Sequence, residues 1–312
     1  MSKFVNTISY NNTEINILRL DVLQPIIQGN KYYKLKYNLL KAKEENKNTV
    51  LTFGGEYSNH IHAFALAGKE QNFKAIGIIR GDKPDELTCT IKESIENGMQ
   101  AYFLNRTDYR IARKLVNNEK FEDFFDLLEQ NNINVNKNDC YIVPEGGTNL
   151  LALQGTSEIL DFAKNIDYNN ICCAIGTAGT IVGIIASARN DKKIIGFPAL
   201  KGNFFEKDIE NYLLKFKNRK YSNWKLKHDY HFKGFGSFNQ DLIDFINRFY
   251  AEYKIPICSI YTGKMFYGIF DMIDKGEFTK EDKILAIHTG GLQGIKAFNE
   301  KNSGLLNFEK SL

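Results

Sequence analysis

The chain has 312 residues, which is too many for one small hydrophobic core and suits two α/β lobes of roughly 100–200 residues each. Hydrophobic residues make up 43% and charged residues 25%, a balance typical of globular proteins that bury a core. The 41 Lys and Arg residues exceed the 37 Asp and Glu residues only slightly and are scattered, which argues against a nucleic-acid partner.

The sequence shows no feature of an exported or membrane protein. Its first residues, Met1–Thr7, lack the apolar core of a signal peptide, and no apolar run approaches the ~20 residues that span a bilayer. The cysteines are odd in number, form no Cys-x-x-Cys pair and lie mostly in apolar runs: Cys89, Cys140, Cys172, Cys173 and Cys258. We therefore expect reduced core cysteines in a cytoplasmic protein with no membrane partner.

Short β-branched or apolar runs alternate with helical patterns, as in βαβ units around parallel sheets. The first set comprises an amphipathic segment at 32–40, strands at 49–53, 75–79, 101–104 and 140–143, and helices beginning at Ser58, at about 86–96 and in a region ending near 128. The second set comprises helices at 150–163, after 180, at 241–253 and at 265–273, with strands at 171–175, 193–197 and 284–287. These elements predict an α/β fold with two lobes that meet near residues 41 and 155.

Glycine- and threonine-rich breaks follow several predicted strands, where open parallel sheets bind ligands. The best anion cradle is Gly176-Thr177-Ala178-Gly179-Thr180, because its glycines let backbone amides converge, its threonines add hydroxyl donors and a helix follows. A plain strand-to-helix turn is the alternative. A Walker lysine and a full GxGxxG are both missing, which argues against a nucleoside triphosphate or a dinucleotide.

Ser58-Asn59-His60 begins a predicted helix, where backbone amides and the Ser58 hydroxyl could bind a small carboxylate. The alternative is that Ser58 only caps the helix. His60 and His62 lie two residues apart, so they point to different faces of a helix, and no third ligand has a matching spacing. We therefore predict no metal site.

Two further segments could carry chemistry. In Tyr261-Thr262-Gly263-Lys264, Tyr261 could act as a general acid or base and Thr262 as a neutral hydroxyl donor, unless the segment is only an exposed turn with a helix cap. Lys31, in Gly29-Asn30-Lys31, begins the amphipathic segment and could carry a carbonyl cofactor, although a surface role is the ordinary one for a lysine.

Taken together and in this order, the motifs resemble the 1-aminocyclopropane-1-carboxylate deaminase/D-cysteine desulfhydrase family of pyridoxal-phosphate enzymes. The resemblance runs from about residue 21 to 294. It rests on Gly29-Asn30-Lys31 with Lys34-Leu35-Lys36-Tyr37, on 52–60, on Pro144-Glu145-Gly146-Gly147-Thr148-Asn149, on 176–180, on 261–264 and on His288-Thr289-Gly290-Gly291. Six motifs in the family's order are far more specific than any one of them.

The resemblance implies the tryptophan-synthase-β-like architecture, fold type II of the pyridoxal-phosphate enzymes, with two three-layer α/β/α lobes and mainly parallel sheets. Residues 1–40 and 155–312 would form the larger lobe, which binds pyridoxal 5'-phosphate, and 41–154 the smaller one, with the cofactor between them. It also implies a small amino acid as substrate and a homodimer.

The resemblance also assigns roles to single residues. Lys31 matches the lysine that carries the cofactor, and it is the expected base. Lys34 matches a lysine near the cofactor phosphate, and the phosphate loop corresponds to Gly176, Thr177, Ala178, Gly179 and Thr180. Asn59 matches the residue at the ring hydroxyl, Ser58 a substrate contact and candidate nucleophile or base, and Tyr261 a tyrosine over the ring. The substrate carboxylate would be held by Ser58 together with Asn59 and His60.

Thr262 and Thr289 distinguish the two branches of the family. The deaminase branch has Glu and Leu at these positions, whereas the desulfhydrase branch has Thr at both. Thr262 would face the pyridine nitrogen, and a hydroxyl there leaves a weaker electron sink than a glutamate would. Loss of a thiolate needs a weaker electron sink than opening of a cyclopropane does. The two threonines therefore favour β-elimination of D-cysteine to pyruvate, sulfide and ammonia. The alternatives are the cyclopropane deaminase and a cofactor-binding protein with little turnover.

Two positions depart from the family pattern. Phe235-Gly236 stands where the family often has a second active-site tyrosine, and Cys258-Ser259 stands where it usually has Asp-Pro. Both leave cofactor binding intact and bear on the choice of substrate.

Overall fold

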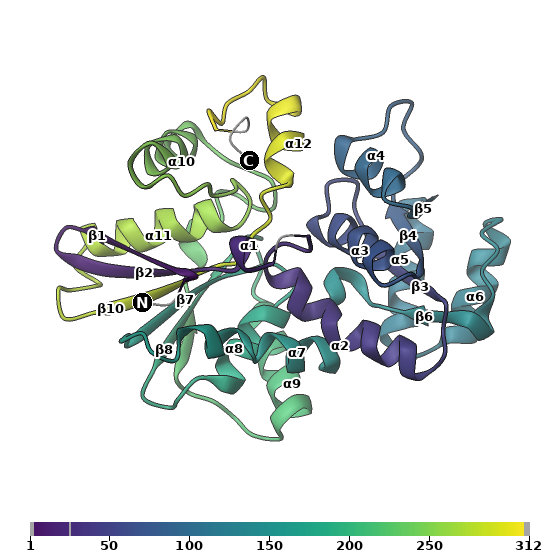
Figure 1. Cartoon of the computed structure of the whole chain (residues 1–312), viewed down its shortest axis with the longest axis horizontal. Helices are drawn as coiled ribbons and strands as arrows, with labels where there is room; N and C mark the ends of the chain where they lie inside the picture. Colours follow the sequence, from purple (N-terminus) through teal and green to yellow (C-terminus); the bar gives the residue numbers. More distant parts are fainter. Residues whose placement is uncertain (1–2, 25, 309–312) are drawn as a thin grey trace. The chain divides into compact units, whose positions relative to one another are not determined.

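The computed structural model describes residues 3–24 and 26–308, which fall into two compact units (Figure 1). Unit 1 contains residues 1–33 and 153–312, and unit 2 contains residues 34–152. The lobes predicted from the sequence had their boundaries at 40/41 and 154/155. Residues 1–2, 25 and 309–312 of those lobes lie outside the described part of the chain. Helix α2 (Asn30–Glu44) begins in unit 1 and continues into unit 2.

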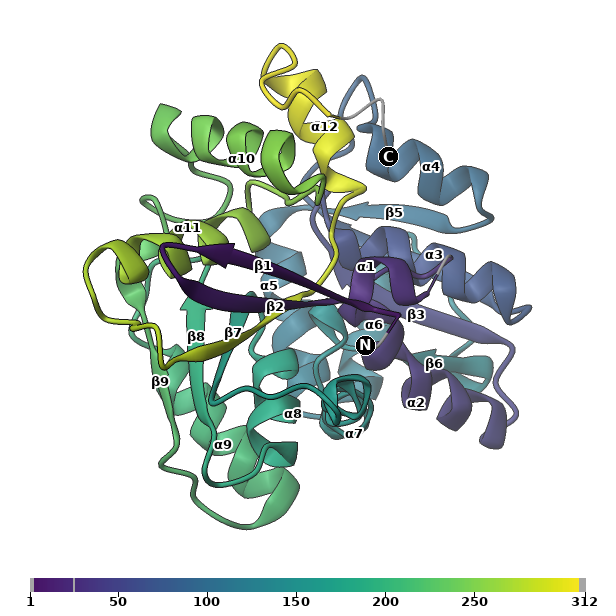
Figure 2. The same cartoon turned by 60° about the vertical axis from the view of Figure 1, so that its left-hand side comes forward.

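Unit 1 is built on a six-stranded sheet in which only the edge pair is antiparallel. In spatial order its strands are β1 (Val5–Tyr10), β2 (Thr13–Arg19), β10 (Lys283–His288), β7 (Asn170–Ile175), β8 (Lys193–Pro198) and β9 (Trp224–Leu226). Pairing of β10 with β2 sets His288 opposite Arg19. The hairpin β1–β2, visible beside β10 in Figure 2, was not predicted from the sequence.

Successive side chains of these strands point to opposite faces of the sheet and contribute to two separate hydrophobic cores. Unit 1 is therefore a three-layer structure. One core joins Ile15, Ala174 and Phe197 to helices α10 and α11. The other joins Leu18, Ile175 and Ile287 to α8 and α9 on the opposite face. The helices of this unit are α1 (Leu20–Leu23), α7 (Leu150–Thr156, which begins at the unit boundary), α8 (Gly179–Ser187), α9 (Phe205–Lys217), α10 (Gln240–Tyr253), α11 (Thr262–Asp274) and α12 (Gly294–Lys301), with 3-10 turns η3 (Ile159–Ala163) and η4 (His228–Tyr230).

The helix predicted over 150–163 is interrupted after Thr156. The Thr156 hydroxyl donates to the Gly179 carbonyl (2.9 Å), and a Cβ atom on Gly155 would lie 1.9 Å from the Tyr33 carbonyl oxygen. These tertiary contacts fix the end of α7, and the chain resumes as the 3-10 turn η3.

Unit 2 has a parallel four-stranded sheet in the order β5 (Gln100–Leu104), β4 (Lys74–Arg80), β3 (Thr49–Gly54) and β6 (Cys140–Ile142). Its helices are α3 (Asn59–Glu70), α4 (Cys89–Glu96), α5 (Arg106–Asn117) and α6 (Phe121–Gln130), with 3-10 turns η1 (Lys137–Asp139) and η2 (Glu145–Gly147). One face of the sheet packs Phe53 and Ile78 against Tyr109 and Phe124 of α5 and α6. Helix α4 starts three residues later than the predicted position 86, because Thr88 caps it by accepting from the Ile91 N–H (3.3 Å).

All five cysteines are buried and none forms a disulfide, as the sequence predicted. Across residues 3–24 and 26–308, none of the helices combines the length and apolar character needed to cross a bilayer.

Candidate active site

The turn that begins helix α2 lies against the carboxyl end of β10. Gly29 has φ +72°, and a Cβ atom there would lie 2.2 Å from the Thr289 carbonyl oxygen. Asn30 donates its backbone N–H to the same oxygen (3.0 Å). Only glycine tolerates both this left-handed backbone and this close approach. These contacts of Gly29 and Asn30 therefore fix the first turn of α2, which carries Lys31, beside the end of β10.

Lys31 is half-buried and tied to the glycine-rich loop through its neighbour. Its Nζ donates to Asn30 Oδ1 (3.0 Å), and Asn30 Nδ2 donates to Thr180 Oγ1 (2.7 Å). Burial lowers the pKa of Lys31 to about 8, against an opposing effect of Cys258. A lysine with that pKa has an appreciable neutral fraction near neutral pH, and the neutral amine is the nucleophilic form.

The predicted anion cradle forms the connection between β7 and α8. Ala178 lies in the left-handed region (φ +59°), and no side chain among the described residues caps α8, so amides of its first turn remain for another acceptor. Thr180 is buried, and its hydroxyl accepts from Asn30 and keeps its own hydrogen to donate. Gly176 lies close to the ring of Tyr261: a Cβ atom on Gly176 would be 3.0 Å from Tyr261 Cε1, a tight contact that would displace the ring slightly. These donors, with an uncapped helix start, suit a phosphate group.

Thr262 is completely buried at the first position of α11, and its hydroxyl is paired with Cys258 in both directions. Thr262 Oγ1 accepts from the Cys258 N–H (2.9 Å) and donates to Cys258 Sγ (3.4 Å). Sulfur is a weak acceptor, so the Thr262 hydrogen can be redirected to a better one at little cost. The preceding residue, Tyr261, is half-buried, and its ring makes an edge-to-face contact with Phe235 at 5.9 Å between centroids.

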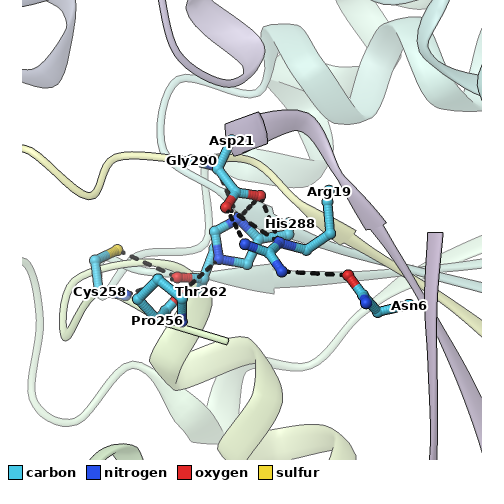
Figure 3. A network of polar contacts seen from close by, with 8 residues as sticks. All are labelled: Asn6, Arg19, Asp21, Pro256, Cys258, Thr262, His288 and Gly290. Atoms are coloured by element: carbon cyan, nitrogen blue, oxygen red, sulfur yellow. Dashed lines mark hydrogen bonds and ion pairs between the residues drawn. The ribbon is translucent and has the colours of Figure 1, made fainter. Parts of the chain in front are cut away.

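A buried charged network, for which the sequence analysis gave no role, lies beneath these residues (Figure 3). Asp21 Oδ1 is 3.0 Å from His288 Nδ1, and Arg19 holds the same carboxylate through Nε (2.8 Å) and Nη2 (2.6 Å). His288 Nε2 is 2.7 Å from the Pro256 carbonyl oxygen. Burial alone would raise the pKa of the Asp21 carboxyl, but the charge of His288 and hydrogen bonds from His288 and Arg19 hold it well below its usual range.

This network connects the segments that carry the candidate residues. His288 immediately precedes Thr289, and Pro256 is two residues before Cys258, which pairs with Thr262. The available sequence signal was the position of His288 at the start of a glycine motif, but its partner Asp21 is 267 positions away.

In unit 2, Ser58 occupies the N-cap position of α3, as predicted. Its Oγ accepts from the N–H groups of His60 (3.2 Å) and Ile61 (3.4 Å), so the capping role is present and the hydroxyl hydrogen remains to donate elsewhere. The His60 side chain is buried, and its Nε2 lies 2.8 Å from Thr52 Oγ1. Asn59, the first residue of α3, is half-buried.

Lys34 is buried in unit 2 and binds the turn after β6. Its Nζ donates to the Gly146 carbonyl and to Thr148 Oγ1, both at 2.9 Å. These bonds join Lys34 to the Pro-Glu-Gly-Gly-Thr segment within this unit. Its predicted place near a phosphate stays a prediction.

The candidate residues form one group in each unit. Unit 1 gathers Lys31, Tyr261, Thr262, Thr289 and the loop 176–180 around the ends of β7 and β10, and unit 2 holds Lys34, Ser58, Asn59 and His60. That the two groups act together stays a prediction. Among the described residues there is no cluster of three or more His, Cys, Asp or Glu side chains suited to a metal ion, and His62 instead lies 3.3 Å from Glu93.

Comparisons with known proteins agree with the resemblance seen in the motifs. A protein of Pyrococcus furiosus named "Putative 1-aminocyclopropane-1-carboxylate deaminase" is 28% identical over 308 residues, which cover 92% of this chain and 88% of the relative. The "Bifunctional D-cysteine desulfhydrase/1-aminocyclopropane-1-carboxylate deaminase, mitochondrial" of Arabidopsis thaliana is 26% identical, over 91% of this chain and 74% of the relative. The solved structure of an "ACC deaminase homologue" superposes with a TM-score of 0.79 at 26% identity, over 94% of this chain and 89% of the other.

These comparisons confirm the predicted family resemblance. No protein-family model matches the chain. A hydrogen sulfide-producing enzyme from Fusobacterium nucleatum, at 14% identity and a TM-score of 0.63, shares the fold over 92% of this chain and 94% of its own. The predicted fold is confirmed as well: the chain has the mainly parallel α/β architecture of fold type II, as relatives of the deaminase/desulfhydrase family do.

Proposed function

We propose that this protein is a pyridoxal 5'-phosphate-dependent enzyme that carries out α,β-elimination on a small amino acid, with D-cysteine as the substrate. The family resemblance supports the cofactor and the reaction class. The observation that carries the choice of substrate is Thr262, a fully buried neutral hydroxyl at the start of α11. The products would be pyruvate, sulfide and ammonia.

When bound, pyridoxal phosphate would supply an electron sink for the bonds at the substrate Cα atom. The residues of unit 1 suit it by their chemistry. Lys31 offers a buried amine with a pKa of about 8, and the loop 176–180 offers hydroxyls and helix amides for the phosphate. Tyr261, whose ring lies against Gly176, would flank the ring of the cofactor.

Lys31 would also move the proton at Cα. Its pKa of about 8 lets the amine accept a proton near neutral pH, and its bond to Asn30 orients Nζ. Thr262 would donate its hydrogen to a neutral ring nitrogen by releasing Cys258 Sγ, while the Cys258 N–H keeps the Thr262 oxygen in place.

The start of α3 would bind the substrate carboxylate. Ser58 Oγ holds the His60 and Ile61 amides and can donate its own hydrogen to an anion at the positive end of the helix. The neighbouring Asn59 would contact the ring hydroxyl of the cofactor. Lys34 would take part in phosphate binding, as the resemblance implies.

A second candidate function is 1-aminocyclopropane-1-carboxylate deamination. It is favoured by the names of the Pyrococcus and Arabidopsis relatives, the second of which names both activities. Thr262 speaks against it because a threonine lacks the negative charge that would keep a ring nitrogen protonated, and Thr289 stands where the deaminase branch has Leu. Phe235, which puts no hydroxyl beside Tyr261, leaves a third outcome in which the cofactor binds with little turnover.

One experiment separates these functions. The purified protein with pyridoxal phosphate is given D-cysteine, L-cysteine or 1-aminocyclopropane-1-carboxylate, and 2-oxo acid and sulfide are measured. We expect pyruvate and sulfide from D-cysteine. Release of 2-oxobutyrate from the cyclopropane substrate would favour the deaminase, and bound cofactor without product would favour the binding protein.

Two variants test the residues that carry the proposal. Lys31→Ala should lose the cofactor that borohydride reduction fixes to the wild-type chain. Thr262→Val, which removes only the hydroxyl, should slow elimination, whereas Thr262→Ser should retain it. Equal rates for all three chains with Thr, Ser or Val would remove the basis for assigning the branch. We further propose a homodimer, which sedimentation of the purified protein would check.

A further inference from the structure

The segment after η4, residues 231–236, has an unfavourable backbone. Phe232 and Lys233 are consecutive residues with positive φ angles of 50° and 70°, and Gly234 (134°) and Gly236 (73°) continue the pattern. Non-glycine residues in this region cost free energy and persist only where their surroundings hold them. Lys233 and Phe235 are themselves exposed, so the restraint must come from another part of the chain.

Part of that restraint comes from Phe232, whose ring packs edge-to-face on Tyr267, and the rest from the side chain of Lys264. Lys264 is 1% exposed, and its Nζ donates to the carbonyl oxygens of Gly234 (2.8 Å), His231 (2.9 Å) and Ala199 (3.4 Å). Three carbonyl acceptors match the three hydrogens of an ammonium group, whereas a neutral amine could satisfy only two. The carbonyls of His231 and Gly234 lie on either side of the strained residues 232 and 233. The bond to Ala199 links the segment to the chain just after β8.

The segment that Lys264 holds also carries the ring that covers Tyr261. Phe235 follows Gly234 directly, remains 50% exposed, and contacts the Tyr261 ring edge-to-face at 5.9 Å with an interplanar angle of 62°. Tyr261 is one turn before Lys264 at the start of α11. A single helical turn therefore bears both the tyrosine and the ammonium that fixes its apolar neighbour.

We propose that Lys264 is a positioning residue whose ammonium tethers the segment 231–236 and thereby holds Phe235 over Tyr261, where it limits which substrates reach the tyrosine. The part concerning substrate rests on the proposed function. The tether itself does not.

The tether is tested by amide hydrogen exchange of the protein without cofactor or substrate. Lys264→Met keeps the apolar stem and removes the ammonium, so exchange of the Gly234 and Ser237 amides, which donate to the His231 and Gly234 carbonyls, should become about tenfold faster or more, as expected for loss of charge-assisted hydrogen bonds. Lys164→Met, which removes an exposed lysine paired with Asp161, is the control and should leave this exchange unchanged. Wild-type exchange in Lys264→Met would overturn the proposal.

A second variant distinguishes loss of the ammonium group from a general loss of stability. Lys264→Ala leaves space beside the three carbonyls, and added ethylammonium should return the exchange of the Gly234 and Ser237 amides toward the wild-type rate. Tetramethylammonium at the same ionic strength has no N–H to donate and should not. If ethylammonium fails to slow exchange, or both cations slow it equally, the ammonium tether is refuted.

The role in substrate choice is read separately. In the active enzyme, Lys264→Met and Phe235→Ala should raise KM for a small substrate by similar factors, with a smaller change in kcat, and should improve the relative rate of a bulkier amino acid. If exchange responds and these ratios do not, the substrate part falls while the tether stands. If wild type itself turns over no amino acid, the proposed function fails while the exchange result is unaffected.

Discussion

Asp21 and His288 form a buried pair that couples a short helix to the end of strand β10, with Oδ1 3.0 Å from Nδ1. His288 Nε2 also faces the Pro256 carbonyl oxygen at 2.7 Å, and the Gly290 N–H lies 3.3 Å from Nδ1. The imidazole ring therefore links the chain near Asp21 to the segment that leads to Cys258 and Thr262. Arg19 completes the network by holding the other side of the Asp21 carboxylate.

Replacement of Asp21 by Asn should be strongly destabilising. It removes the carboxylate charge that pairs with Arg19 and leaves that buried guanidinium without compensation, for which about 3–5 kcal/mol is typical. Urea unfolding of the cofactor-free protein measures the change. Asp161→Asn, which breaks the exposed pair with Lys164, is the control and should cost less than about 1 kcal/mol. A similar small loss in both variants would mean that the network does not stabilise the fold.

Gly29→Ala should misplace the turn that presents Lys31. The added Cβ meets a left-handed φ of +72° and, in addition, the Thr289 carbonyl oxygen at 2.2 Å. Gly276→Ala is a matched control because its φ is +70° and its Cβ has open space within 4 Å. We expect about 1–2 kcal/mol from backbone strain at Gly276 and a larger loss at Gly29. Thermal unfolding and borohydride fixation of the cofactor would be measured together, and equal effects in the two variants would refute the close approach.

Local patterns were enough to predict the four strands of unit 2, the strands β7, β8 and β10 of unit 1 and the glycine-rich loop after β7. They did not predict the short edge strand β9 or the hairpin β1–β2, whose first strand has exposed and half-buried residues and joins the sheet only at its edge. Its turn at Asn11 and Asn12, both with positive φ, is the signal that could have indicated it. Likewise, α7 ends where Thr156 contacts Gly179, a contact that no local pattern contains.

The residues of the candidate site also fall into those that local motifs predict and those that depend on tertiary contacts. Motifs in the sequence located Lys31, Ser58, Thr262 and the loop 176–180, because each depends on its neighbours in the chain. The Arg19–Asp21–His288 network and the carbonyl cage around Lys264 depend on residues brought together by strand pairing and helix packing. One sequence alone does not show which strands pair, so it cannot identify the distant partner of a buried charged residue.

The buried lysines predict how stability depends on pH on the alkaline side. Burial lowers the pKa of both Lys31 and Lys264 to about 8, below the value near 10.4 expected in the unfolded chain. The unfolded chain therefore binds more protons between these values, so the stability contributed by each lysine rises with pH from about 8 to about 10. Each adds at most about 1.4 kcal/mol per pH unit.

Unfolding free energies of the cofactor-free protein at several pH values measure this slope. Lys31→Met and Lys264→Met should each flatten it, and Lys275→Met, where the pairing with Asp271 raises the pKa, should not. The quantity to compare is the difference between wild type and variant, because the buried thiols Cys140 and Cys172, whose pKa values burial raises, act in the opposite sense above about pH 8.5. The range stops near pH 10, above which tyrosines such as Tyr33 do the same. An unchanged slope in both Met variants would contradict the lowered pKa values.

Ser58 provides a test that separates helix capping from substrate binding. Its Oγ accepts from the His60 and Ile61 amides, so Ser58→Ala should cost about 1 kcal/mol of stability. Asp is an equally good cap, and Ser58→Asp should restore that stability while its ionised carboxylate has no hydrogen to donate. If the hydroxyl holds the substrate carboxylate, both variants should raise KM although only Ala unfolds more easily. A wild-type KM in Ser58→Asp would leave Ser58 as a helix cap and remove it from the proposed substrate site.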